Sequence, residues 1–302
     1  MRFLPIYILI FMLFSCVDKS PDEPIEPDPK PEIEPKPEPE SQPWKIGFIA
    51  IGDQGTGNKD QFAVADGIEK YCLVNQCDFG ITLGDNIYDN GIKSDSDPLM
   101  QERFEKPYKN LKFIFYPTLG NHDVRHCWIC QVRYQSPKWK MGGQWYEYSK
   151  GQAQFFALDT NWDYYRTIFG GGKKQREWLE GKLAQSSSRW KIIYGHHPVY
   201  SNGMHGDGLR MKSILRPELL KYKVDFYFSG HDHHLELIEK DGMRYIISGA
   251  AGKLRSVKPD KYTKYAKSTL GFAHMTLTQH EAKLRFIDYK ARIIYEKVFK
   301  KD

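Results

Sequence analysis

The sequence predicts an α/β fold with a strand-rich C-terminal end, and three patterns support this prediction. Five apolar runs of strand length each end at a glycine that is followed at once by a polar residue. Amphipathic stretches with a helical period lie between these runs. Gly271–Phe299 alternates apolar and polar residues, as antiparallel strands do. The 302 residues are 40% hydrophobic, which is enough to bury one sizeable core or two small ones and excludes a wholly disordered chain.

Residues 1–16 have the layout of an export signal. Arg2 precedes twelve uncharged residues, Phe3–Phe14, and Ser15 and Cys16 follow. The apolar run is too short to span a bilayer comfortably, and Cys16 stands where a bacterial lipoprotein signal has its lipidated cysteine. We therefore predict a lipoprotein-type signal peptide, with a simple cleaved signal as the alternative.

Residues 17–43 have almost nothing to bury. They hold nine of the 17 prolines, and residues 18–43 carry nine acidic and three basic side chains. We predict a disordered, extended Pro- and Glu-rich linker before a folded domain at residues 44–302. The formal net charge is +6 overall and +11 for residues 44–302, which favours anionic partners. No motif that combines aromatic and basic residues points to nucleic acid, so none is expected as a partner.

The five apolar runs share one ending, in which a potential metal ligand comes directly after the glycine. They are Lys45–Ile51 before Gly52-Asp53, Phe79–Leu83 before Gly84-Asp85, Phe113–Leu119 before Gly120-Asn121, Lys191–Tyr194 before Gly195-His196, and Val224–Ser229 before Gly230-His231. Glycine lets the chain turn sharply without strain. Five such strands in one sheet would deliver five polar groups to a crevice outside their C-terminal ends.

Covering helices are expected between these strands. The amphipathic stretches are Gln61–Val74, Lys173–Ser186 and Lys212–Tyr222. The tail, Gly271–Phe299, is expected to form two or three antiparallel strands.

Four further cysteines lie in two close pairs, at 72 and 77 and at 127 and 130. An even number in an exported chain favours disulfides, within each pair or between the pairs. Buried thiols are an alternative. A zinc site made of all four thiolates is another, because Cys127 and Cys130 have the inner spacing of such sites.

The side chains at the strand ends are oxygen and imidazole donors without thiolate. They are Asp53, Asp85, Asn121, His196, His231 and His233. Such a mixture suits iron, zinc or manganese, and it is too large for one ion. Two ions that share one bridging carboxylate would account for the number of ligands. Paired ions are commonly used for displacement reactions at phosphorus. Each motif alone is more often a turn, a helix cap or a satisfied polar residue.

Taken in order, the motifs resemble the five blocks of the calcineurin-like metallophosphoesterase superfamily. The blocks are Gly52-Asp53-Gln54-Gly55, Gly84-Asp85-Asn86-Ile87-Tyr88, Gly120-Asn121-His122-Asp123, Gly195-His196-His197-Pro198 and Gly230-His231-Asp232-His233. A tyrosine three residues after the second aspartate is similar to the purple acid phosphatases, and further matches resemble their short, tartrate-resistant type. These matches are Pro198–Ser201, His205-Gly206, Leu215–Leu220 and Ser248–Gly252. The resemblance covers about residues 44–300 and implies a four-layer αββα sandwich, with a dinuclear site at the C-terminal ends of the strands.

The resemblance also implies a role for each residue. It places Fe(III) on Asp53, Asp85, Tyr88 and His233, and a divalent Fe, Zn or Mn on Asp85, Asn121, His196 and His231. A metal-bound hydroxide would attack phosphorus, while His122 and His205 would orient the phosphate and protonate the leaving oxygen. An acidic optimum would follow, because an imidazole with a pKa near ~6.5 still carries its proton in mild acid.

Several residues depart from the family pattern or fall outside it. Gln54 replaces an aromatic residue, and His197 replaces a tyrosine and is expected to line the pocket wall. Four histidines have no motif support and are expected to be surface or packing residues: His126, His234, His274 and His280.

The sequence thus predicts an exported acid phosphatase that hydrolyses phosphomonoesters. Its partners would be phosphorylated small molecules or phosphopeptides, with a membrane contacted only through an N-terminal lipid, and a monomer is expected. The location would be the outer membrane or cell surface as a lipoprotein, or otherwise the periplasm or the medium. The alternatives are a phosphodiesterase or nucleotide pyrophosphatase on the same scaffold, and a non-catalytic surface lipoprotein that binds iron or anions.

Overall fold

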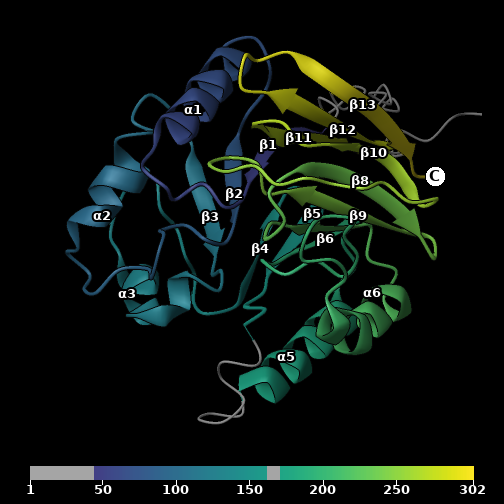
Figure 1. Cartoon of the computed structure of the whole chain (residues 1–302). Helices are drawn as coiled ribbons and strands as arrows, with labels where there is room; N and C mark the ends of the chain where they lie inside the picture. Colours follow the sequence, from purple (N-terminus) through teal and green to yellow (C-terminus); the bar gives the residue numbers. More distant parts are fainter. Residues whose placement is uncertain (1–43, 162–170) are drawn as a thin grey trace, which may run out of the picture. The chain divides into compact units, whose positions relative to one another are not determined.

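The computed structural model describes residues 44–161 and 171–302. The predicted signal peptide and linker lie outside the described residues. Within them the chain forms two β-sheets with helices on their outer faces (Figure 1). No helix among the described residues is long and apolar enough to cross a bilayer.

The first sheet has the strand order β13-β12-β11-β1-β2-β3. Its strands are β1 (Lys45–Ile51), β2 (Phe79–Leu83), β3 (Ile114–Thr118), β11 (Gly271–Thr278), β12 (Glu281–Asp288) and β13 (Ile293–Lys300). The neighbours β1, β2 and β3 run parallel, while β11, β12 and β13 run antiparallel to one another. The prediction of two or three antiparallel strands in the C-terminal segment is therefore confirmed, and the segment forms three.

The second sheet has the order β10-β8-β9-β7-β6-β5-β4. Its strands are β4 (Tyr146–Lys150), β5 (Ala153–Ala157), β6 (Trp190–Tyr194), β7 (Phe226–Ser229), β8 (Leu235–Lys240), β9 (Met243–Ser248) and β10 (Thr263–Lys267). The prediction of five motif-bearing strands in one sheet is wrong, because β1, β2 and β3 belong to the first sheet and β6 and β7 to the second. A continuous apolar run shows that a strand is covered on both faces, but it does not say which strand lies beside it.

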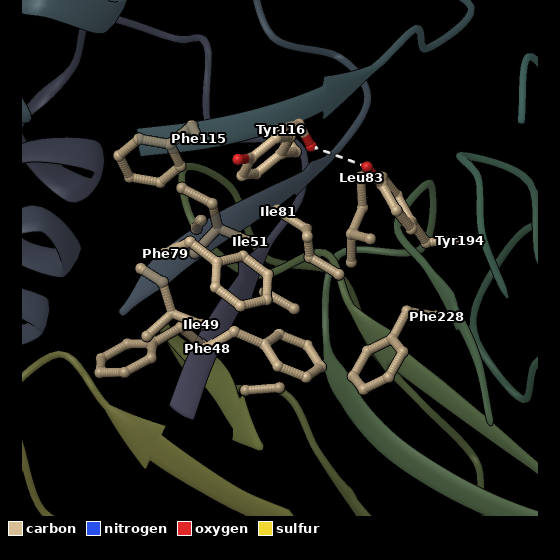
Figure 2. Close-up of a cluster of buried hydrophobic side chains, with 14 of the residues drawn as sticks. Phe48, Ile49, Ile51, Phe79, Ile81, Leu83, Phe115, Tyr116, Tyr194 and Phe228 are labelled. Atoms are coloured by element: carbon tan, nitrogen blue, oxygen red, sulfur yellow. Dashed lines mark hydrogen bonds between the residues drawn. The ribbon is translucent and has the colours of Figure 1, made fainter. Parts of the chain in front are cut away.

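The inner faces of the two sheets pack against each other through aromatic rings (Figure 2). The ring of Phe48 on β1 lies 5.3 Å from that of Phe155 on β5 and 5.7 Å from that of Phe228 on β7, both edge-on. The hydroxyl of Tyr194 donates to the carbonyl oxygen of Tyr116 across the same interface at 3.2 Å, the dashed line in Figure 2. Edge-to-face pairs of this kind add to the free energy gained by burying the rings.

Helices cover the outer face of each sheet. Helix α1 (Lys59–Cys72) packs on the first sheet, where the hydroxyl of Tyr71 lies 3.1 Å from Nδ1 of His274 on β11. Helix α5 (Gly171–Gln185) packs on the second, with the rings of Trp178 and Phe156 6.4 Å apart. A π-helical turn, Met211–Leu215, leads into α6 (Arg216–Lys221) beside it. The four-layer αββα sandwich is thus confirmed (Figure 1).

Short helical segments complete the described chain. They are α2 (Pro98–Met100), which continues as a π-helical turn over Gln101–Glu105, a 3₁₀ turn at Asp123–Arg125, and α3 (Trp128–Arg133).

Both cysteine pairs close locally, as the disulfides Cys72–Cys77 and Cys127–Cys130. This supports the disulfide reading within each pair and leaves no thiolates at these positions for a four-cysteine zinc site. The second disulfide spans the start of α3.

Candidate metal centre

The ends of the five motif strands meet where the two sheets approach each other. The backbone N–H of Asp53 donates to the carbonyl oxygen of Gly84 at 3.0 Å, which joins the ends of β1 and β2. Nδ1 of His196, after β6, lies 2.8 Å from the carbonyl oxygen of Leu83 at the end of β2. This contact crosses from the second sheet to the first. The predicted crevice therefore exists, but it lies at the seam between two sheets.

The glycines before the ligands have the predicted role at one position, Gly84, whose φ is 83°. Left-handed backbone is also found at the residues that follow the glycines, with φ of 59° at Asp53, 52° at Asp85 and 69° at His231. At Gly120, an added Cβ would lie 2.1 Å from the backbone nitrogen of Asp85. This glycine thus permits close approach of the strand ends. Left-handed conformations at non-glycine residues cost roughly 1–3 kcal/mol each and gather at functional sites.

The first group of predicted ligands comprises Asp53, Tyr88 and His233. The hydroxyl of Tyr88 donates to Oδ1 of Asp53 at 3.0 Å and lies 3.3 Å from Nε2 of His233. Nε2 of His233 lies 3.3 Å from Oδ1 of Asp53. All three residues are buried, with at most 4% of their surface exposed. Their donor atoms therefore face one common point.

The second group comprises Asp85, Asn121, His196 and His231. Nε2 of His196 lies 3.0 Å from Oδ1 of Asn121, 3.2 Å from Nδ1 of His231 and 3.5 Å from Oδ1 of Asp85. Asp53, Asp85 and His196 each offer a donor atom within 4.8 Å of the others, so the two groups adjoin. All seven predicted metal ligands thus lie in one cluster, and its oxygen and nitrogen donors fit two cations of the iron, zinc or manganese type.

The protonation of the cluster reflects its burial. Burial opposes ionisation of Asp53, but the hydrogen bond with His233 and the charge of His196 outweigh it and lower the pKa of this carboxyl group. Burial also opposes a charge on His196, yet the Asp85 and Asp53 carboxylates raise its pKa. For Tyr88, burial and both carboxylates raise the pKa of the phenol far above its ordinary value. Its ionisation therefore requires a strongly acidic cation in contact with the oxygen.

Two buried carboxylates that sequence reasoning did not assign support the cluster. Asp123 accepts hydrogen bonds from the backbone N–H groups of Gly120, at 2.8 Å, and Asn86 and Ile87, both at 3.0 Å, which clamps the β2 and β3 ends together. Burial, followed by the charge of Asp85, raises the pKa of Asp123 to about 6. The sequence gives one indication of this role, which is that Asp123 lies in the third motif block.

The second carboxylate, Asp232, positions the loop that carries His205. It accepts hydrogen bonds from the hydroxyl of Ser201 at 2.5 Å and from the backbone N–H of His205 at 3.0 Å. Asp232 is fully buried. The sequence indicates this role only by the position of Asp232 between two predicted ligands in the fifth block.

The two histidines predicted to contact substrate flank the cluster. Nε2 of His122 lies 3.9 Å from Oδ2 of Asp85, and its ring lies 4.6 Å from that of Tyr88. The ring of His205 stacks on that of His231, with 4.1 Å between centroids. One imidazole therefore borders the first group and the other borders the second.

A cavity of about 560 Å³ adjoins the second group. It is lined by Asn121, Val124, Thr160, Asn161, His197, Gly208, Leu209, Arg210 and Met211. His197 thus lines a pocket wall, as predicted, although it could also group with His196 and His231 around an ion. Burial, and then the charge of His196, lowers the pKa of His197 to about 3, so its imidazole is neutral near pH 7.

The remaining histidines take the structural roles expected of them. His126 and His280 are exposed. His234 and His274 are buried, and they contact Glu236 and Tyr71 respectively. Gln54 donates to Oδ1 of Asn86 at 3.0 Å, which places it beside the second block and outside the donor cluster.

The two-sheet sandwich and the donor cluster at its seam define a metallophosphoesterase. A sequence profile of the calcineurin-like phosphoesterase family matches residues 47–235. Purple acid phosphatase 17 of Arabidopsis thaliana is 30% identical over 288 residues, which cover 85% of each chain. Tartrate-resistant acid phosphatase type 5 of Oryctolagus cuniculus is 28% identical over 84% of this chain and 92% of its own. The chain belongs to the calcineurin-like phosphoesterases and, within them, to the purple acid phosphatases.

Solved structures agree on the fold. GAP50, described as the anchor in the inner membrane complex of Plasmodium, superposes with a TM-score of 0.76 at 24% identity over 85% of this chain and 89% of its own. Purple acid phosphatase PPD1 from yellow lupin (Lupinus luteus) gives 0.71 at 16% identity over 86% of this chain and 55% of its own.

Proposed function

We propose that this chain is an acid phosphatase that hydrolyses phosphomonoesters at a dinuclear metal centre. The main support for the proposal is that all seven predicted ligands lie in one cluster at the seam between the sheets. Membership of the purple acid phosphatases supplies the reaction class.

In this proposal Asp53, Asp85, Tyr88 and His233 hold Fe(III), and Asp85, Asn121, His196 and His231 hold a divalent Fe, Zn or Mn. Tyr88 supports iron at the first position, because a phenol ionises near ~10 when free and only a strongly acidic cation would hold it as phenolate at low pH. Two cations bound here would lower the pKa of water and offset the negative charge of the phosphate group.

The protein's own groups orient the substrate and move protons. The backbone N–H of His122 donates to Oδ1 of Asp85 at 2.9 Å, and Nδ1 of the same residue lies 2.5 Å from the carbonyl oxygen of Asp89. These contacts hold the ring so that Nε2 faces the cluster. His205 is held by Asp232 on the other side. Either imidazole can donate a proton to the leaving oxygen when it is protonated. Burial, and then the charge of Arg255, lowers the pKa of His205.

Export and lipid attachment are proposed on the sequence of residues 1–43. The apolar run before Cys16 supports a lipoprotein signal, and the Pro-rich segment would separate the catalytic domain at residues 44–302 from a membrane surface.

The test of the proposal is the colour of the iron-loaded protein. A Tyr88 phenolate bound to Fe(III) should give a broad visible absorption band, and Tyr88→Phe should lose it while Asp53, Asp85 and His233 still retain metal. Tyr245→Phe is the matched control, since the buried Tyr245 hydroxyl has no hydrogen-bond partner within the described part of the chain and its removal should leave the band intact.

Two outcomes would contradict the assignment. Oxidised wild-type protein shown to hold iron but lacking colour would remove Tyr88 from the ligand set. Faster hydrolysis of bis(p-nitrophenyl) phosphate than of p-nitrophenyl phosphate would favour the phosphodiesterase alternative.

A further inference from the structure

Two basic side chains lie against the site from a segment that the metal assignment does not use. This segment, Gly252–Arg255, follows the second-sheet strand β9. Nζ of Lys253 lies 3.7 Å from the centre of the Tyr88 ring. The guanidinium of Arg255 contacts Nε2 of His205. One cation therefore stands beside the first ligand group, and the other stands beside a predicted substrate-contacting residue.

The backbone of the segment is fastened to the site. The side-chain amide of Asn58 donates to the carbonyl oxygen of Gly252 at 3.2 Å, and the backbone N–H of Arg255 donates to that of His233 at 3.0 Å. At Gly252, an added Cβ would lie 2.8 Å from the carbonyl oxygen of Asp53. These contacts fix where Lys253 and Arg255 leave the backbone. Leu254 between them is 46% exposed, so the segment borders solvent.

Among the residues that the structure describes, neither cation has a carboxylate partner. Other arginines of the chain do, as in the pairs Arg216–Asp241 and Arg285–Glu296, each with 2.6 Å between nitrogen and oxygen. Within residues 44–161 and 171–302, no carboxylate oxygen lies within 4.0 Å of a side-chain nitrogen of Lys253 or Arg255. Two unpaired cations beside a proposed dinuclear metal centre repel it, and an anion bound between them would relieve that repulsion.

We propose that Lys253 and Arg255 form a second anion site, which selects phosphomonoesters that carry another carboxylate or phosphate group. The inference rests on the proposed function, because the first phosphate group occupies the metal centre. The second anionic group would then lie over the Gly252–Arg255 segment. Lysine supplies a mobile point charge, and arginine supplies a planar fork of donors that matches a carboxylate or phosphate.

The experiment compares two substrates of similar size. 3-Phosphoglycerate and glycerol 3-phosphate both carry one phosphate ester on three carbons, but only the first has a carboxylate at the other end. The wild-type enzyme should have the higher kcat/KM with 3-phosphoglycerate. Lys253→Gln and Arg255→Gln should each lower the ratio of the two kcat/KM values about 5-fold, mainly through KM for 3-phosphoglycerate. High salt should lower the wild-type ratio in the same direction.

Lys258→Gln is the matched control. Lys258 is an exposed lysine in the same stretch of chain, and its backbone N–H, rather than its side chain, contacts Asn202 at 3.0 Å. This variant should keep the wild-type ratio. Metal content should equal that of the wild type in all three variants.

The outcomes separate this inference from the proposed function. An enzyme that hydrolyses both substrates with an unchanged ratio in Lys253→Gln and Arg255→Gln would overturn the second anion site. An equal fall of kcat on both substrates would also overturn it, because that result would mean that Lys253 and Arg255 only position Tyr88 and His205. If the wild type with two metals bound hydrolyses neither these compounds nor p-nitrophenyl phosphate, the proposed function fails.

Discussion

Replacement of Gly120 by alanine should damage the proposed metal centre although it replaces none of the proposed ligands. The added Cβ would lie 2.1 Å from the backbone nitrogen of Asp85 and 2.2 Å from its Oδ1, whereas ordinary contacts begin near 3.4 Å. The two strand ends would have to separate by about 1 Å. Metal–ligand distances tolerate only about 0.2 Å, so Asp85 would leave the position from which it is proposed to hold both ions.

The expected magnitudes follow from this displacement. Overpacking of a well-packed site costs about 1–3 kcal/mol in the free energy of unfolding. A shift of about 1 Å at reacting groups lowers turnover about 100-fold. Metal analysis, kcat with p-nitrophenyl phosphate and urea denaturation of the purified variant measure these effects separately.

Gly181→Ala provides the comparison. Gly181 lies in α5, and an added Cβ there meets no atom within 4 Å. This variant should keep full activity and gain about 1 kcal/mol of stability, because alanine favours helix over glycine. A Gly120→Ala enzyme that retains two metals and wild-type turnover would refute the account of how the sheets meet.

Three further predictions concern proton transfer, the β12–β13 turn and the N-terminus. His122→Ala and His205→Ala should each lower kcat about 100-fold and alter the pH profile with metal content retained. Burial opposes ionisation of Asp288, but hydrogen bonds from Arg292 and backbone N–H groups outweigh it and lower its pKa. Asp288→Asn should therefore cost about 1 kcal/mol at pH 7, and the difference should shrink below pH ~4 as the wild-type carboxylate is protonated. Cys16→Ser should move the protein from the detergent phase to the soluble fraction.

Each of these three has an outcome that would count against it. Metal loss from the histidine variants equal to that of His196→Ala would merge the two proposed roles. If the free energy of unfolding in urea differs between Asp288→Asn and wild type as much at pH 3 as at pH 7, the charge of the carboxylate is not the cause of the difference. Wild-type protein that never enters the detergent phase would dismiss the lipid anchor.

The strands nearest the site were the most predictable elements. The predicted bounds of β1 and β2 match the structure residue for residue, because each is a continuous apolar run closed by glycine. β3, β6 and β7 differ from their predicted bounds by one or two residues. β4, β5, β8, β9 and β10 were not predicted, since their pairing depends on contacts distant in sequence.

The candidate site was also predictable only in part. Motif order was enough to select the seven proposed ligands, which the structure places together. The roles of Asp123 and Asp232 could not be derived, because both act through backbone N–H groups whose positions only the folded chain defines. Lys253 and Arg255 were missed for a related reason, as nothing local in the sequence places them beside Tyr88 and His205.

The seam between the sheets divides the proposed ligands between two parts of the chain. Asp53, Asp85, Tyr88 and Asn121 follow strands of the first sheet, while His196, His231 and His233 follow strands of the second. A partly synthesised chain that ends before β6 therefore lacks every imidazole of the set. Ions bound at the completed centre would act as a cross-link between the sheets, and their binding free energy would add to the stability of the folded state. Metal supply would then govern how long the protein survives proteolysis as well as how fast it turns over its substrate.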